Sequence, residues 1–112
     1  MKTNQELIEE AIFHVLGSVF TMHRRSEILL EEVREASDKE EVFKRRRSTV
    51  EGIALTLIST RINIEETQIV LRKLDGLSKS ATYEFSRRLS KAEELQSDLE
   101  ANMRKIAEIF EA

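Results

Sequence analysis

The chain has 112 residues, 35% of them charged and 5% aromatic, with three glycines, no proline and no cysteine; its formal net charge is −3 at pH 7. This composition excludes a disulfide framework and a thiolate metal site, and it argues against a β-sheet protein. The small negative charge gives no general attraction to nucleic acid. Because almost nothing interrupts helix propagation, we expect a single all-α domain over residues 1–112.

The first predicted helix covers residues 3–36. Thr3 and Glu6 fit a capping box at its start, in which each side chain satisfies a free backbone N–H. Its apolar seam advances in alternating steps of four and three residues, typical of a and d positions in a heptad: Ile8, Ile12, Val15, Val19, Met22, Ser26, Leu29, Val33 and Ala36. A flanking stripe widens this face enough to touch two neighbours, and its apolar half consists of Phe13, Leu16 and Phe20.

The second predicted helix covers residues 39–75. Its start is capped either by Ser37 with Glu40 or by Asp38 with Glu41, and so short a connection requires an antiparallel hairpin. Its seam again follows steps of three and four: Phe43, Arg46, Val50, Ile53, Leu57, Thr60, Ile64, Thr67, Leu71 and Leu74. A second stripe widens its apolar face: Leu55, Ile58, Ile62 and Ile69.

Two glycines mark positions inside the second predicted helix and just after it. Gly52, inside the second helix, indicates close approach of a neighbouring helix, and Gly76 can adopt the left-handed conformation that closes a helix. A third helix is then predicted over residues 79–110, with the seam Ala81, Phe85, Arg88 or Leu89, Ala92, Leu95 or Gln96, Leu99, Asn102 or Met103, Ile106, and Ile109 or Phe110. The predicted fold is all-α: a long antiparallel helical hairpin with a third helix packed along it, as a coiled-coil-like three-helix bundle.

The run of four cations at residues 44–47 leaves two interpretations open. It contacts phosphates or lipid headgroups together with Arg24 and Arg25, or it is neutralised across the hairpin by acidic residues of the first helix, namely Glu31, Glu32 and Glu35. Residues 1–38 hold four basic and eight acidic side chains, and residues 39–76 hold eight and six. This difference in charge favours antiparallel pairing of the two segments.

No combination of residues predicts catalysis or a metal site. His14 and His23 are nine residues apart, which places them on different sides of a helix at about 100° per residue. We therefore expect them in ordinary pairs with Glu10 and Glu27, one helical turn away. The chain has no Gly-rich phosphate loop and no carboxylates in an apolar setting. We expect neither enzyme activity nor a cofactor.

A family resemblance covers the stretch from Leu29 to Leu77. It consists of the hinge sequence at residues 36–39 (Ala-Ser-Asp-Lys) and a pattern deep in the second helix: Thr60, Ile62, Ile64, Glu65, Ile69, Leu71, Arg72 and Leu74. This stretch resembles archaeal ESCRT-III-like cell-division proteins of the CdvB type. The resemblance implies a helical hairpin that polymerises. The first helix of that family is usually basic and meets membranes, whereas the first helix here is acidic.

The wide apolar faces lead us to expect a non-enzymatic, self-assembling protein that forms homo-oligomers. Its predicted self-contact residues are Phe13, Leu16 and Phe20, with Leu55, Ile58 and Ile62. One alternative is a helical-bundle adaptor that binds a single protein partner through the same faces. Another is a binder of membrane surfaces or nucleic acid through the basic patch of Arg24, Arg25, Lys44, Arg45, Arg46 and Arg47. The chain shows no apolar core of a signal peptide and no cysteine, so we expect a cytoplasmic protein.

Overall fold

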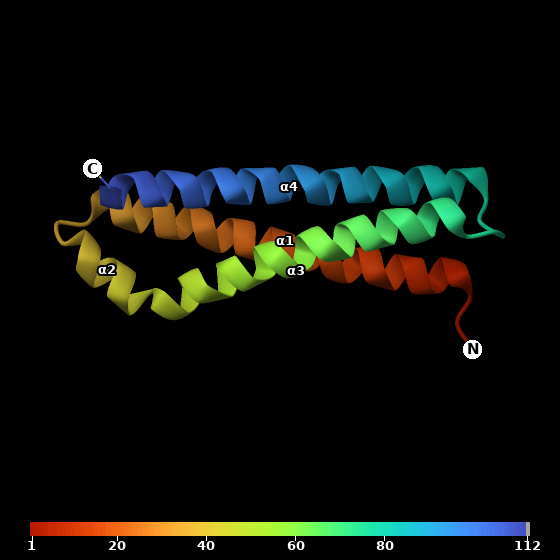
Figure 1. Cartoon of the computed structure of the whole chain (residues 1–112), viewed down its shortest axis with the longest axis horizontal. Coiled ribbons are helices and arrows are strands. Elements are labelled where there is room, and N and C mark those ends of the chain that lie inside the picture. The colour runs from red at the N-terminus through yellow and green to blue at the C-terminus, as the bar shows by residue number, and fades with distance from the viewer. Residues whose placement is uncertain (112) are drawn as a thin grey trace.

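A computed structural model describes residues 1–111, which form four helices and no strand: α1 (Asn4–Glu35), α2 (Lys39–Arg45), α3 (Arg47–Lys73) and α4 (Lys79–Glu111) (Figure 1). The hairpin is formed by α1 and the antiparallel α2–α3 arm, and α4 returns along both, with its largest interface on α1. The molecule measures 56 × 23 × 17 Å. The predicted all-α hairpin with a further helix along it is confirmed. None of these helices is apolar enough over a sufficient length to cross a bilayer.

Side-chain caps mark the starts of α1 and α2. The Thr3 hydroxyl accepts the backbone N–H of Glu6 at 3.1 Å, as the capping box predicted. At the hairpin, the carboxylate of Asp38 accepts the backbone N–H of Glu41 at 3.2 Å, so the second of the two capping alternatives is the one used. Gly76 has φ +85°, and this left-handed conformation turns the chain between α3 and α4.

The predicted seams form the interior of the bundle. On α1 the buried residues are Ile8, Ile12, Val15, Val19, Ser26, Leu29, Leu30 and Val33. On α4 they are Phe85, Leu89, Ala92, Leu95, Gln96, Leu99 and Ile106. Where the predicted seam of this helix left two neighbouring positions as alternatives, Leu89 is buried in preference to Arg88, while Leu95 and Gln96 are both buried.

Two polar contacts lie within this apolar interior. The Asn102 amide donates to the Ser26 hydroxyl at 3.0 Å, which joins α4 to α1. On the other side of α4, the Thr60 hydroxyl lies 3.2 Å from the side-chain amide oxygen of Gln96. A buried polar group without a partner costs about 1–3 kcal/mol, so both contacts favour the observed register of α4 over a shifted one.

The prediction of one continuous helix over residues 39–75 is wrong at Arg46. This residue has φ −98° and ψ 15° and separates α2 from α3. In a straight helix the seam would carry the Arg46 guanidinium inward, where an unpaired charge is costly. In the bent helix Arg46 instead donates to Glu32 across the hairpin. Val42 takes the buried position, and Phe43 packs edge-to-face on Phe110 with ring centroids 4.8 Å apart.

The expectation that Gly52 marks a close approach of another helix is also wrong within this chain. A Cβ atom added at Gly52 would meet no atom within 4 Å, and the same is true at Gly17 in α1. Packing among residues 1–111 therefore requires a glycine at neither position.

We predict that two leucine-to-alanine substitutions have very different effects on stability. Leu99 is fully buried, so Leu99→Ala should lower the free energy of unfolding by about 2–5 kcal/mol through lost burial and a residual cavity. Leu55 is 69% exposed, so Leu55→Ala should change it by less than about 0.5 kcal/mol. Urea denaturation at low protein concentration measures both, and equal losses would contradict the observed core.

Candidate interaction surfaces

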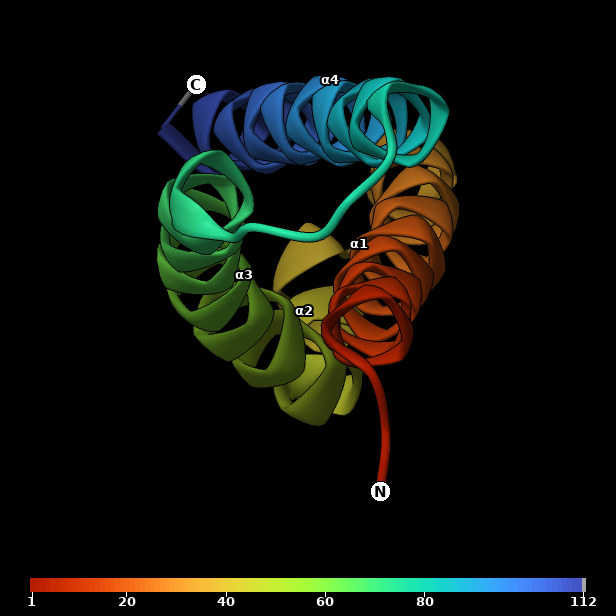
Figure 2. The same cartoon turned by 90° about the vertical axis from the view of Figure 1, so that its right-hand side faces the viewer.

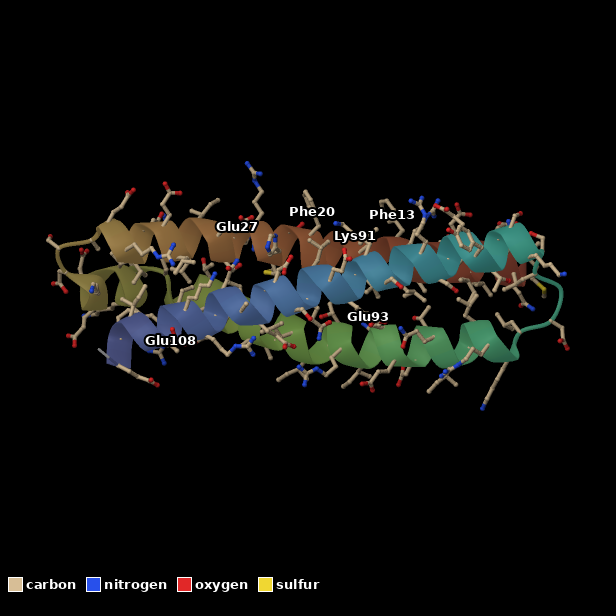
Figure 3. The ribbon with its side chains drawn as sticks, turned by 90° about the horizontal axis from the view of Figure 1, so that it is seen from above. Phe13, Phe20, Glu27, Lys91, Glu93 and Glu108 are labelled. Carbon is tan, nitrogen blue, oxygen red and sulfur yellow. The ribbon has the colours of Figure 1, made fainter. Side chains whose placement is uncertain are left out.

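An apolar stripe lies on the outer side of α1, and we call Phe13, Leu16 and Phe20 the α1 stripe. Phe13 is 74% exposed and Phe20 is 58% exposed. Figure 3 shows both rings pointing away from the bundle, on the side of α1 turned away from α3. Leu16 differs, because it is half-buried against the core cluster that contains Val19 and Leu95. The two phenylalanines are therefore the accessible part of the α1 stripe.

A second stripe lies on α3 opposite its buried face, and we call Leu55, Ile58, Ile62 and Ile69 the α3 stripe. Leu55 is 69% exposed, Ile58 is 63% exposed, and the other two are also exposed. The interior of the bundle is met instead by Ile53, Thr60, Ile64 and Leu71. At about 100° per residue the α3 stripe lies on the far side of the helix from these four positions. The predicted self-contact residues therefore form two surfaces on different helices, not one patch.

Three of the four cations in the basic run are paired within the chain. Arg46 donates to both carboxylate oxygens of Glu32, at 2.9 and 2.7 Å. Arg45 lies 3.6 Å from Glu41, and Arg47 lies 3.0 Å from Glu51, each four residues away on the same arm. Neutralisation across the hairpin is therefore observed for Arg46 alone, and of the three expected first-helix glutamates only Glu32 takes part. Within residues 1–111, no ion pair is made by Arg24, Arg25 or Lys44.

The two histidines have different surroundings. His23 Nδ1 lies 3.4 Å from the Glu27 carboxylate, as expected for a pair one turn apart. The expected pair of His14 with Glu10 is wrong, because Glu10 instead accepts a hydrogen bond from the ammonium group of Lys2. In the part of the chain that the structure describes, no three His, Cys, Asp or Glu side chains converge in a way that could hold a metal ion.

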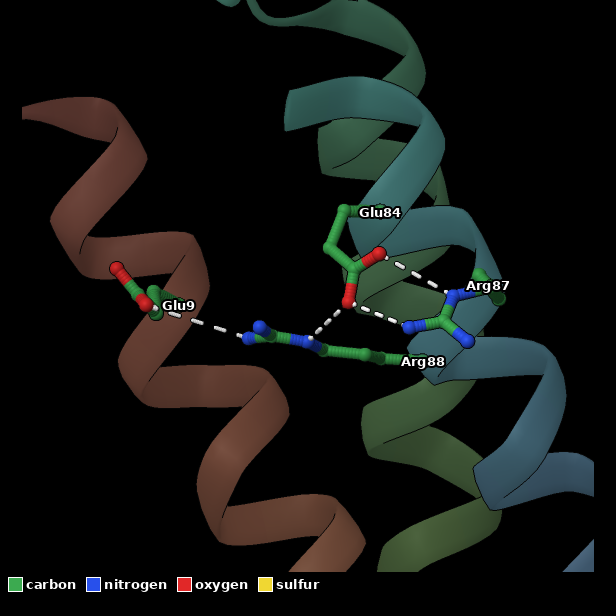
Figure 4. A network of polar contacts seen from close by, with 4 residues as sticks. All are labelled: Glu9, Glu84, Arg87 and Arg88. Carbon is green, nitrogen blue, oxygen red and sulfur yellow. Dashed lines mark hydrogen bonds and ion pairs between the residues drawn. The ribbon is translucent and has the colours of Figure 1, made fainter. Parts of the chain in front are cut away.

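A polar network on α4 was not predicted from the sequence. Glu84 accepts hydrogen bonds from Arg87 at 3.2 and 2.9 Å and from Arg88 at 3.1 Å, and Arg88 also lies 4.0 Å from Glu9 of α1 (Figure 4). The hydrogen bonds from Arg87 and then Arg88 lower the pKa of the Glu84 carboxyl. The network therefore joins the starts of α1 and α4 at the surface.

A groove of about 550 Å³ lies between the first half of α1 and the second half of α3. Figure 2 views this end of the molecule and shows the two helices on opposite sides beneath α4. The groove is lined by Leu7, Ala11, His14, Asn63, Glu66 and Val70, among others. No sequence motif indicates it, because it depends on how far α1 and α3 diverge.

Comparison with protein-family models, curated proteins and solved structures gave no match for this chain. The ESCRT-III-like resemblance of residues 29–77 therefore stays a prediction.

We predict that acidification weakens the bundle through Glu32. The hydrogen bond from Arg46 lowers the pKa of the Glu32 carboxyl below its ordinary value of 4.5. A carboxyl with a lowered pKa in the folded state stabilises that state above pH 4.5, and this contribution is lost as the pH falls through the folded-state pKa. Between pH 7 and pH 3, the melting temperature of Glu32→Gln should therefore fall less steeply than that of the wild type, as measured by thermal unfolding.

Glu31→Gln is the matched control for this measurement, because Glu31 makes no ion pair within residues 1–111. It should keep the wild-type pH dependence. An identical slope for Glu32→Gln and the wild type would show that the pair with Arg46 contributes nothing to stability.

Proposed function

We propose that this chain is a non-enzymatic structural protein that assembles with copies of itself through the α1 stripe and the α3 stripe. The observation that carries the proposal is the exposure of large apolar side chains at helical spacing on two separate faces. Full burial of one such side chain is worth about 1.5–3 kcal/mol, and clustered exposed apolar groups are typical of interaction sites. Association would bury these side chains.

The presence of two separate surfaces favours assemblies larger than a pair. A protein with one self-complementary patch stops at a dimer, whereas unlike patches on different faces lead to rings or open chains. The resemblance of residues 29–77 to ESCRT-III-like proteins is consistent with polymerisation through helical hairpins. A cytoplasmic setting suits a chain without cysteine.

The groove between α1 and α3 favours a second candidate, an adaptor that binds one helix of another protein. Its walls carry exposed apolar side chains, including Leu7 and Val70, over about four helical turns. This candidate predicts a chain that remains monomeric alone and forms a tight one-to-one complex with its partner.

We expect the mass of the purified protein to rise with concentration in size-exclusion chromatography with light scattering, at low and high salt. Phe20→Glu and Ile58→Glu should each shift it toward monomer, because each places a charge within an apolar contact. Tyr83→Glu is the matched control, since Tyr83 is 72% exposed on α4, outside both stripes. A wild-type protein that stays monomeric at every concentration would exclude self-assembly.

A further inference from the structure

We propose that successive copies dock α3 onto α1, with Ile58 of one copy seated over Gly17 of the next. This inference rests on the proposed self-assembly and specifies its contact. It follows from the spacing of the exposed residues, from a glycine that the chain's own packing does not require, and from the distribution of charge around the two stripes.

The α1 stripe frames a hole on the helix surface. Phe13, Leu16, Gly17 and Phe20 stand at positions i, i+3, i+4 and i+7, the spacing of four residues that surround a knob in helix–helix packing. Gly17 is exposed, and a Cβ atom added there would meet nothing within 4 Å. Glycine inside a helix is less favourable than alanine by about 1 kcal/mol. Gly17 thus lowers helix stability without any packing need in this chain, and it leaves bare backbone between two exposed phenyl rings.

The α3 stripe supplies a matching knob. Ile58 is 63% exposed and stands at the centre of the stripe, between Leu55 and Ile62. With Ser59 these residues repeat the i, i+3, i+4 and i+7 pattern, with a small residue at the same place that Gly17 occupies on α1. Ridges and grooves of the two helices can therefore interdigitate, and the absent side chain at Gly17 lets the helices approach closely.

The distribution of charge identifies a second copy of this chain as the occupant. The α1 helix has three basic and seven acidic side chains, and the α3 helix has four basic and three acidic ones. Contact of α1 with α3 of another copy therefore joins opposite charges, whereas contact of α1 with another α1 joins like charges.

Local charges agree with this choice and favour parallel helices. Arg24 lies one turn beyond Phe20, and Glu66 lies one turn beyond Ile62; neither makes an ion pair within residues 1–111. If the helices run parallel, these two side chains meet. At the other end of the contact, Glu9 and Glu51 come together, and each already has a basic partner in its own chain, Arg88 for Glu9 and Arg47 for Glu51.

Substitutions at Gly17 distinguish an effect on this contact from an effect on the stability of the fold. Gly17→Ala should raise the melting temperature of the monomer, because alanine favours the helix and meets no neighbour. It should also weaken self-association, and Gly17→Leu should weaken it at least about tenfold by filling the hole. Gly52→Ala is the matched control: it should raise the melting temperature in the same way and leave self-association unchanged. Undiminished assembly of Gly17→Leu would overturn the inference.

Mixing two variants tests whether the stripes bind each other. Phe13→Glu/Phe20→Glu removes the hole and keeps the knob, and Leu55→Glu/Ile58→Glu does the opposite. Each variant alone should be monomeric, and an equimolar mixture should give a discrete dimer in light scattering. A homodimer of the Phe13→Glu/Phe20→Glu variant would show that α3 pairs with itself and would overturn the inference while self-assembly stands. A wild-type protein that is monomeric throughout would instead remove the proposed function itself.

Discussion

The burial of one face of α1 is the constraint on which the rest of the structure depends. Val19 and Val33 on this face are fully buried, and α1 is in contact with both arms that return along it. Because the buried positions advance by four and three residues, the helix keeps the same side toward the interior over its whole length. All remaining positions on α1 then lie on one side or the other of this buried face. Phe13 and Phe20 are exposed for this reason, since they lie well away from the seam.

The sequence predicted the buried faces well because the spacing of the apolar residues alone decides which face of each helix is buried. Steps of three and four residues locate the interior whatever the partner helix is, and the seams of α1 and α4 are buried where they were expected. The break at Arg46 could not be predicted in this way. It depends on a carboxylate fourteen residues earlier, on the other arm of the hairpin, and a linear pattern does not show that Glu32 is within reach of the guanidinium.

The candidate surfaces were predicted only in part. The apolar stripes on α1 and α3 could be read from the sequence because they follow the same helical period as the seams. Their separation onto two faces could not, since it depends on how the helices are rotated about their own axes in the bundle. The groove beside Leu7 and Val70 could not be predicted for a related reason, because it arises where α1 and α3 diverge beneath α4.

The glycines inside α1 and α3 show that helix stability and the shape of the surface favour different residues at the same position. A helix of this kind gains from alanine at every exposed interior position, and the open space around Gly17 and Gly52 would admit a methyl group at both. Only Gly17 lies between two exposed aromatic rings. A missing side chain has little value on a polar helix face, but between two exposed phenyl groups it leaves an opening that the side chain of another helix can enter. The distinction between the two glycines therefore depends on their neighbours and not on their own conformation.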